Sequence, residues 1–215
     1  FSPQLYWPIN RIAQSFPVLL GWWDKENKKH RHLWPGISVG RDTSVKTVNE
    51  TLSQIMITRG MTPQSMGTVH WNIASVMKNE ALAKALLEGP YKKQALVPAS
   101  SWIDKKPPSA PEVTTEQIGD SIRISWSHPH ERDVFHWVVY YQYGKVWNYA
   151  ILNRNDRHIN LKRWAGDSSR KAVLNFIAVT AVDRTGNESS RKALPQGGNA
   201  TAMATPVTKI ITGKP

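Results

Sequence analysis

A strand-like run followed by a helical pattern occurs three times in the first hundred residues, and this repeat most constrains the fold. The runs occupy residues 4–9, 33–39 and 67–73. Their spacing of about thirty residues is what a barrel of eight β/α units requires. A doubly wound parallel sheet is the structural alternative, because spacing alone does not separate the two arrangements. The pattern therefore predicts three parallel β/α units, which are too few to close a barrel.

Side chains within each run alternate between two faces, as they do in any strand. One face is expected to pack against the helices. The other is expected to look into the interior, where barrels carry their active sites. The helix-facing set is Leu5, Trp7, Ile9, Leu33, Pro35, Ile37, Val39, Val69, Trp71 and Ile73. The inward set is Gln4, Tyr6, Asn10, Trp34, Gly36, Ser38, Thr68, His70 and Asn72.

Capping residues and helix breakers mark where the intervening helices begin and end. Ser15 precedes Pro17, a residue that the first turn of a helix tolerates because it needs no N–H there. The other expected caps are Thr43 or Ser44, after a turn at residues 40–42, and Asn79. The expected stops are Gly60 and the pair Gly89 and Pro90. The apolar stripe expected in the core from the first helix is Leu19, Trp22 and Trp23.

The composition changes at residues 104–111, a proline-rich segment that is typical of a linker between domains. Beyond it the hydrophobic period is alternating instead of helical. The strand-like runs of this half are 121–126, 134–143, 146–152, 157–161 and 173–183. Five short strands separated by turn residues predict an antiparallel β-sandwich.

The composition excludes several classes of protein. The chain has 215 residues and no cysteine, which excludes disulfides and cysteine-ligated zinc. No apolar run approaches the ~20 residues of a membrane span. Because the sequence starts at Phe1, inside what looks like a strand, we expect the remaining barrel strands to lie upstream of Phe1 in a longer protein.

The formal net charge of +12 raises the question of a nucleic-acid partner. The basic residues are scattered over both halves, and the one cluster, residues 25–32, reads as a solvated loop. No phosphate-binding loop, zinc knuckle, helix-turn-helix or RNA-recognition signature is present. We therefore expect no nucleic-acid partner.

Residues 111–190 resemble a fibronectin type III domain. SIRISWSHP matches the second strand of that family, with Trp126 in the core and Pro129 after it. AVTAVDRTGNES matches the sixth strand and its turn at Gly186 and Asn187. Asn175 stands where the family usually has a corner tyrosine, so the corner must pack differently. The resemblance implies a spacer or docking module without catalysis.

Residues 1–102 resemble the end of the glycosyl-hydrolase-like 10 family, the YddW and YngK type. The matching segments are SPQLYW, LLGWWDKE with its Trp22 and Trp23, and GTVHWNIAS through the LVP exit to Trp102. The resemblance implies strands six to eight of a (β/α)₈ TIM-type barrel, and a polysaccharide or peptidoglycan-type glycan as substrate. It also implies an extracytoplasmic, periplasmic or cell-envelope location, with a lipoprotein anchor on the parent protein as one option. One departure is the pair His70 and Trp71, where two aromatic residues are more usual.

The catalytic groups of a glycoside hydrolase are not found in this chain. The reaction normally needs two carboxyl groups about 5 to 10 Å apart, and none of the three runs carries an inward Asp or Glu. Asp42 is the only carboxylate expected near the strand ends, and it reads as a helix cap. His70 has no nucleophile beside it and reads as a hydrogen-bonding wall residue. We expect no catalytic residue, metal or cofactor here, with the acids upstream.

Substrate binding is what this half can supply, since aromatic rings stack on sugar rings and amides and hydroxyls bond sugar hydroxyls. The chain has ten tryptophans. The candidate substrate-binding residues are Gln4, Tyr6, Trp7, Trp34, Ser38, His70 and Asn72. Each of them can equally be a filler of the barrel interior.

The expected domains are a partial glycoside-hydrolase-like barrel (1–103), a linker (104–111), a fibronectin III-like sandwich (112–195) and a tail or edge strand (196–215). The whole protein is expected to be a glycoside hydrolase, and this chain alone is expected to be inactive. A non-catalytic carbohydrate- or protein-binding module is the alternative, and a basic nucleic-acid binder is a distant third.

Overall fold

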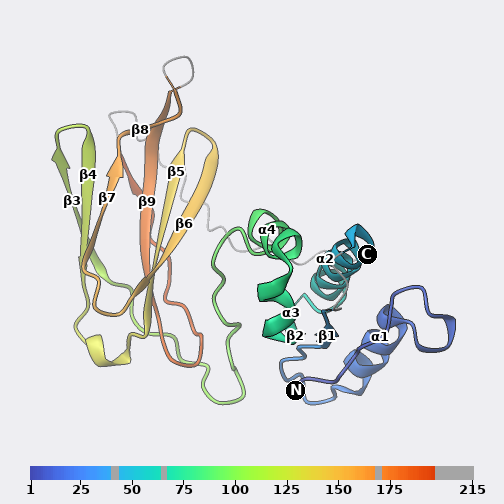
Figure 1. Ribbon diagram of the computed structural model, residues 1–215. Coiled ribbons are helices and arrows are strands. Elements are labelled where there is room, and N and C mark those ends of the chain that lie inside the picture. The colour runs from blue at the N-terminus through green and yellow to red at the C-terminus, as the bar shows by residue number, and fades with distance from the viewer. Residues whose placement is uncertain (40–43, 64–66, 168–170, 197–215) are drawn as a thin grey trace. The chain divides into compact units, whose positions relative to one another are not determined.

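The computed structural model describes residues 1–39, 44–63, 67–167 and 171–196 (Figure 1). Contacts divide the chain into two units, Phe1–Gln94 and Ala95–Pro215. The division precedes residues 104–111 because the segment before them is bonded to the second unit: the Ser100 N–H donates to the Thr185 carbonyl at 2.7 Å. The expected turn at residues 40–42, the candidate cap Thr43 and the tail from residue 197 lie outside the described residues.

In its described residues, the first unit contains a short parallel sheet and four α-helices. Its elements are η1 (Ile12–Gln14), α1 (Phe16–Glu26), β1 (Gly36–Ser38), α2 (Val45–Met61), β2 (Val69–Trp71), α3 (Ile73–Lys78) and α4 (Glu80–Glu88). β1 and β2 pair in parallel, and Gln4 forms a parallel bridge to Gly36. The expected parallel order of the three runs is confirmed, although the first run contributes a bridge and not a full strand. The sheet is open, and the described residues form no barrel.

The core of the first unit lies between this sheet and the helices. Its buried residues are Leu5, Phe16, Leu20, Leu33, Ile37, Val39, Val48, Ile55, Leu82 and Leu86. The core residues that come from the first two runs are Leu5, Leu33, Ile37 and Val39. All four belong to the expected helix-facing set, which confirms the assignment of faces in these two runs. Burying such side chains stabilises the unit by about 1.5–3 kcal/mol each.

Two of the expected caps are confirmed. The Ser44 Oγ accepts the Thr47 N–H at 3.3 Å, and the Asn79 Oδ1 accepts the Leu82 N–H at 3.0 Å. Ser15 precedes α1 without capping it, because its hydroxyl donates to the Ile9 carbonyl at 2.6 Å. Gly60 does not end α2, which continues to Met61, whereas α4 ends at Glu88 just before Gly89 as expected.

The prediction that Trp22 lies in the core is wrong. Its side chain is 53% exposed, while Phe16 and Leu20 are buried and Leu19 and Trp23 pack partly against them. Each residue advances about 100° around a helix because a turn contains 3.6 residues. Trp22, two positions after the buried Leu20, therefore points to nearly the opposite side of α1.

The second unit is an antiparallel sandwich, as predicted. One sheet has the order β3 (Glu112–Ile118), β4 (Ser121–Ser127), β7 (His158–Lys162). The other has the order β10 (Leu194–Pro195), β9 (Ala172–Val182), β5 (His136–Tyr143), β6 (Val146–Asn153). The remaining elements are β8 (Trp164–Ala165), which pairs with β9, and η2 (Glu131–Asp133). β3 and β10 were not expected from the sequence, because β3 is largely polar and β10 has only two residues.

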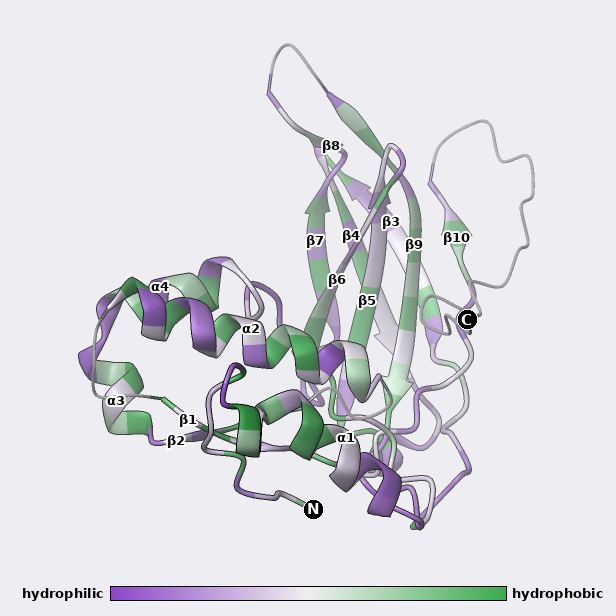
Figure 2. Ribbon diagram, turned by 90° about the vertical axis from the view of Figure 1, so that its right-hand side faces the viewer, coloured by the Kyte–Doolittle hydropathy of each residue, from purple (hydrophilic) through white to green (hydrophobic). Residues whose placement is uncertain are grey.

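Apolar side chains of both sheets fill the sandwich, and Figure 2 shows their green colour along β5 and β9. Trp126 is buried as expected, and its indole N–H donates to the Asp156 carbonyl at 3.1 Å. Asn175, at the corner position, donates its side-chain amide to the Gly144 carbonyl at 2.7 Å. That bond ties β9 to the β5–β6 turn.

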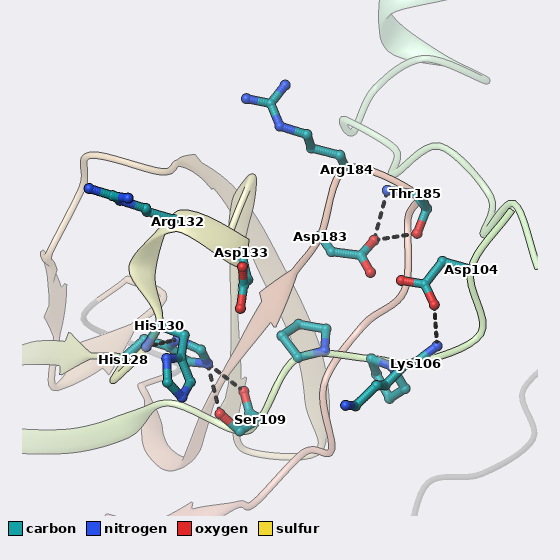
Figure 3. Close-up of a pocket in the computed structure, with 12 residues that line it drawn as sticks. Asp104, Lys106, Ser109, His128, His130, Arg132, Asp133, Asp183, Arg184 and Thr185 are labelled. Atoms are coloured by element: carbon teal, nitrogen blue, oxygen red, sulfur yellow. Dashed lines mark hydrogen bonds between the residues drawn. The ribbon is translucent and has the colours of Figure 1, made fainter.

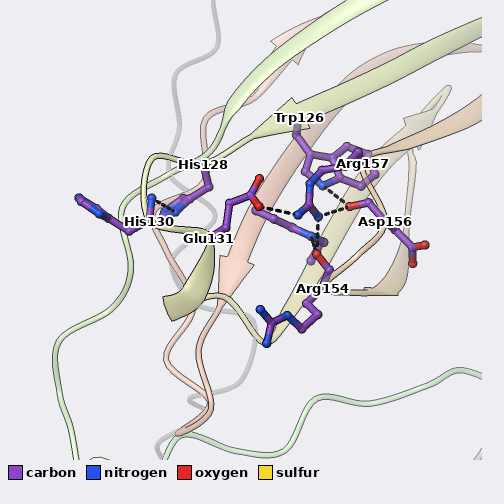
Figure 4. Close-up of polar contacts among 8 residues, drawn as sticks. Trp126, His128, His130, Glu131, Arg154, Asp156 and Arg157 are labelled. Atoms are coloured by element: carbon purple, nitrogen blue, oxygen red, sulfur yellow. Dashed lines mark hydrogen bonds and ion pairs between the residues drawn. The ribbon is translucent and has the colours of Figure 1, made fainter.

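The η2 turn is joined to the start of β7 by an ion pair, drawn in Figure 4. The Arg157 guanidinium contacts the Glu131 carboxylate at 2.8 Å and also donates to the carbonyls of Arg154 and Asp156. No helix in the described part of the chain is long and apolar enough to cross a bilayer.

Candidate functional site

The side of the first sheet that faces away from the helices is the candidate functional site. Ile37 lies in the core and is paired in register with His70, so these two side chains share the helical side. The residues on either side of them alternate to the opposite side. We call that side the open face, and its residues are Gln4, Tyr6, Gly36, Ser38, Val69 and Trp71.

The assignment of faces in the third run is wrong. His70 points to the helical side, while Val69, Trp71 and Ile73 are exposed. Tyr91, which follows α4, offers His70 a polar partner on the helical side, and β2 ends at Trp71 so that Ile73 begins α3. A shift of one residue moves a whole strand to the other face.

An aromatic pair covers the open face. The rings of Tyr6 and Trp71 lie with their centroids 6.5 Å apart and their planes at 29°. They come from the two runs that flank β1. A Cβ atom on Gly36, in β1, would lie 3.3 Å from Cε1 of Tyr6, so the absence of a side chain there lets the tyrosine ring lie over the sheet. Trp71 is 59% exposed.

The structure brings some of the predicted site residues together with this pair. Gln4 and Ser38 are exposed on the same face. Asn72 follows Trp71 directly, and its Oδ1 accepts the Ser75 N–H at 3.2 Å, so it caps α3. The Trp71–Asn72 peptide bond is cis.

Three predicted site residues lie apart from the pair. Trp34 is at the amino-terminal end of β1, where its ring stacks on His32 with centroids 5.4 Å apart. Trp7 is half-buried, and its carbonyl accepts the Gln54 amide of α2 at 3.1 Å. His70 is on the helical side. The sequence pattern assigned Trp71 to the helix-facing set. The structure places Trp71 on the open face, so it joins the candidate site.

His70 anchors β2 to the segment after α4. Its Nε2 lies 2.5 Å from the Tyr91 hydroxyl, which is also 3.0 Å from the Thr68 hydroxyl. Burial lowers the pKa of His70 below 6.5. Burial also raises the pKa of Tyr91, against the lowering effects of the Thr68 hydrogen bond and the Arg59 charge. Both side chains are therefore uncharged at neutral pH, and they position the strand without reaching the open face.

Stability of the first unit is expected to fall as the pH drops below the unfolded histidine value of 6.5. The unfolded chain takes up a proton there while buried His70 does not, so the unfolding free energy rises with pH until 6.5 is passed. His70→Gln should reduce this slope, measured by urea unfolding at pH 5.5 and 7.5. His30→Asn, at an exposed site, should keep it, and equal slopes in wild type and His70→Gln would contradict the assignment.

The six open-face residues offer aromatic rings, an amide and hydroxyls, and none of the six is a carboxylate. Glu50 of α2 lies on the helical side, where its Oε1 accepts the Ile9 N–H at 2.7 Å and the Gln54 amide at 2.9 Å. Asp42 lies outside the described residues. Within the described ranges, no group of three or more His, Asp or Glu side chains could hold a metal ion.

A concave region with a volume of about 520 Å³ lies at one end of the sandwich (Figure 3). The nearly buried His128 bonds Ser109 through Nε2 and accepts the His130 N–H through Nδ1. Burial alone would raise the pKa of Asp183, but hydrogen bonds from Asn187 and Thr185 outweigh it and hold that pKa low. His128 and Asp183 are thus each bonded to neighbouring groups of the protein, which indicates a structural role.

Comparison with known proteins gives one sequence relative and weak structural likenesses. No family model matches the chain. Over 201 residues, 87% of its length, it is 26% identical to glycosyl hydrolase YngK of Bacillus subtilis (strain 168), and it spans 39% of that protein.

Two solved structures illustrate the structural likenesses. The Clostridium perfringens spore cortex lytic enzyme SleM is 13% identical, with a TM-score of 0.35 over 89% of this chain and 78% of that one. The FN3 domain of human collagen XX is 18% identical, with a TM-score of 0.34 over 47% of this chain and 100% of that one. The strand order itself defines the sandwich topology of the second unit.

Proposed function

We propose that this chain is the substrate-binding, C-terminal part of a glycoside-hydrolase-like protein that acts on a polysaccharide or peptidoglycan-type glycan. The observation that carries the proposal is the Tyr6–Trp71 pair on the open face. It lies towards the carboxyl ends of parallel strands, where α/β proteins bind their ligands. The 26% identity to a glycosyl hydrolase supports the same class of ligand.

The open face suits a sugar because it combines rings with uncharged polar groups. The rings of Tyr6 and Trp71 stack on the apolar side of a pyranose, and the Gln4 amide and Ser38 hydroxyl bond its hydroxyl groups. Asn72 stands at the rim. His70 acts indirectly, by holding β2 in place through Tyr91.

The three parallel runs are proposed to be the last three strands of a (β/α)₈ barrel. Their sheet is open, and on closure the open face with Tyr6 and Trp71 would line the interior at the carboxyl ends of the strands, where such barrels bind their ligands. The catalytic carboxylates would then come from the other strands, so this chain alone binds glycan without hydrolysing it. We propose an extracytoplasmic, cell-envelope location for the parent protein.

A non-catalytic glycan-binding module is the second candidate function. The absence of carboxylates from the open face favours it, as does the sandwich, a fold that often serves as a spacer. Both candidates require that the open face binds glycan. They differ in whether other strands of the parent protein supply catalytic carboxylates.

Trp71→Ala is expected to lower the affinity of the chain for N-acetylglucosamine oligosaccharides at least tenfold, about 1.4 kcal/mol. The substitution removes one stacking ring, and because Trp71 is 59% exposed the melting temperature should change little. Trp71→Phe should retain most of the affinity. Isothermal titration calorimetry with chitohexaose measures each value.

Trp22→Ala is the matched control, because this tryptophan is 53% exposed on α1 and lies outside the open face. It should bind as the wild type does. Equal affinities of Trp71→Ala, Trp22→Ala and wild type would place the glycan site elsewhere.

A further inference from the structure

The outer side of α1 exposes large apolar side chains to solvent. Phe16 and Leu20 hold the opposite side of the helix in the core. Val18 is 69% exposed and Trp22 is 53% exposed. These two residues are four positions apart, so they lie one above the other on the outer side. The Trp22 ring meets the Trp23 ring edge-on, with centroids 4.8 Å apart, and this contact supports it from the core side.

Lysines continue the outer side of α1. Lys25 is exposed and follows Trp22 by three positions and Val18 by seven, which places it on the same side of the helix. Lys28 and Lys29 come next, in the loop after α1, and are also exposed. Figure 2 shows α1 changing from green to purple towards this end. We call Val18, Trp22, Lys25, Lys28 and Lys29 the outer patch.

Hydrogen bonds hold the lysine loop in one shape. The Asn27 side chain accepts the Arg31 N–H at 3.0 Å and donates to the Arg31 carbonyl at 2.6 Å. The His30 N–H donates to the Asn27 carbonyl at 2.9 Å. Lys28 and Lys29 lie between these closing contacts. The loop therefore presents both lysines without having to be ordered by a partner.

Positive charge predominates around the outer patch. Residues 24–31 contain the basic residues Lys25, Lys28, Lys29 and Arg31 and the acidic residues Asp24 and Glu26. The Glu26 carboxylate lies 3.9 Å from the Lys28 ammonium, in an exposed pair that solvent screens. The Lys28 ammonium also donates to the Lys25 carbonyl at 2.7 Å. The patch thus combines a net positive charge with exposed apolar side chains.

This combination selects an anionic lipid surface as the partner. Tryptophan and lysine both suit a bilayer interface, where the indole ring lies at headgroup level and the lysine stem packs on apolar groups while its ammonium reaches the phosphates. A soluble polyanion would pair with the lysines and leave Val18 and Trp22 in water. An acidic protein is a poorer match, because lysine is depleted at protein–protein interfaces.

We propose that the outer patch binds the surface of an anionic lipid bilayer, with α1 lying flat against it. The inner side of α1 stays in the core, while Val18 and Trp22 enter the interface and the lysines meet lipid phosphates. Contacts of this size give reversible binding. The patch uses no residue of the open face, so the inference goes beyond the proposed function.

The test is co-sedimentation of the 215-residue chain with vesicles of equal parts phosphatidylglycerol and phosphatidylcholine, compared with vesicles of phosphatidylcholine alone. Wild type should bind the anionic vesicles, and added salt should weaken the binding. Trp22→Ala should raise the apparent Kd about tenfold, because it removes the largest apolar group of the patch. The double variant Lys28→Gln, Lys29→Gln should raise it at least about tenfold.

Matched controls remove the same kinds of side chain elsewhere. Trp164→Ala removes a tryptophan that is 41% exposed on β8. The double variant Lys105→Gln, Lys106→Gln removes two adjacent exposed lysines. Both controls should bind anionic vesicles nearly as wild type does. Circular dichroism melts confirm folding, and the variant at positions 28 and 29 tests the patch without altering α1.

The outcomes separate this inference from the proposed function. Trp22→Ala should lose vesicle binding and keep its glycan affinity, whereas Trp71→Ala should do the reverse, so either proposal can fail alone. Equal binding of wild type to the two kinds of vesicle overturns the inference, as does wild-type binding by folded Trp22→Ala. If only the lysine variant weakens vesicle binding and it also loses binding to soluble polyphosphate, the patch is a polyanion site and the membrane inference is overturned.

Discussion

Replacement of Trp137 by alanine is expected to lower the unfolding free energy of the second unit by about 3–5 kcal/mol. Trp137 is fully buried between the sheets, and its ring lies 6.1 Å from that of Trp126. Its indole N–H donates to the Arg154 carbonyl at 3.1 Å. The variant therefore leaves a cavity and removes one of the two hydrogen bonds to the Arg154 carbonyl, which keeps the bond from Arg157. Because of the cavity, the loss should be among the largest for any single residue of this unit.

Amide hydrogen exchange locates this effect. Protection of β5 and β9 should fall sharply in Trp137→Ala, while α1 and α2 of the first unit keep their protection because the two cores contain different residues. Trp164→Ala removes the same side chain from a site that is 41% exposed and should cost less than about 1 kcal/mol. Similar losses in the two variants would mean that Trp137 is not the centre of the sandwich core.

Gly186→Ala is expected to destabilise the second unit by at least about 2 kcal/mol. Gly186 has φ of +85°, a conformation that strains any residue with a Cβ atom. The added Cβ would also lie 2.8 Å from the Val97 carbonyl and 3.1 Å from the Ala99 Cα. Both contacts are to backbone, which cannot move aside as a side-chain end would. Residues 97–100, which pack on the turn that follows β9, should therefore be displaced.

Gly119→Ala is the control for this prediction. Gly119 has a similarly positive φ of +58° in the β3–β4 turn, but nothing lies within 4 Å of the added Cβ. Its cost should be the backbone strain alone, about 1 kcal/mol. Urea denaturation of both variants measures the difference, and a Gly186→Ala cost no greater than that of Gly119→Ala would show that residues 97–99 do not pack on the turn.

Local sequence signals predicted much of the framework because they act over a few residues. The hydroxyl of Ser44 and the side-chain oxygen of Asn79 cap helices through bonds to residues three positions away. The alternation of Leu33, Ile37 and Val39 predicted which side of β1 is buried. The period change after residue 111 predicted the sandwich, and Trp126 was placed in its core.

The sequence could not decide which face of the third run would be buried. Residues 67–73 alternate between two sets that each contain a large side chain, so either set fits against an apolar layer. The choice depends on Tyr91, 21 residues after His70, whose hydroxyl gives the histidine a partner on the helical side. Burial of a histidine is costly without such a partner. Trp71 consequently turns to the open face, where it meets Tyr6.

The alignment of side chains across β6, β5 and β9 was also beyond the sequence, for a related reason. Trp147, Gln142 and Phe176 come from three strands, and their alignment depends on the pairing of β5 with both of its neighbours. Alternation within one strand shows which residues share a side, and it carries no information about register between strands. The sequence by itself determined the elements, the two kinds of core and most buried positions, because those follow from local periodicity. Only the tertiary structure decided which side chains meet on the open face and across β6, β5 and β9, because such meetings depend on contacts between residues far apart in the chain.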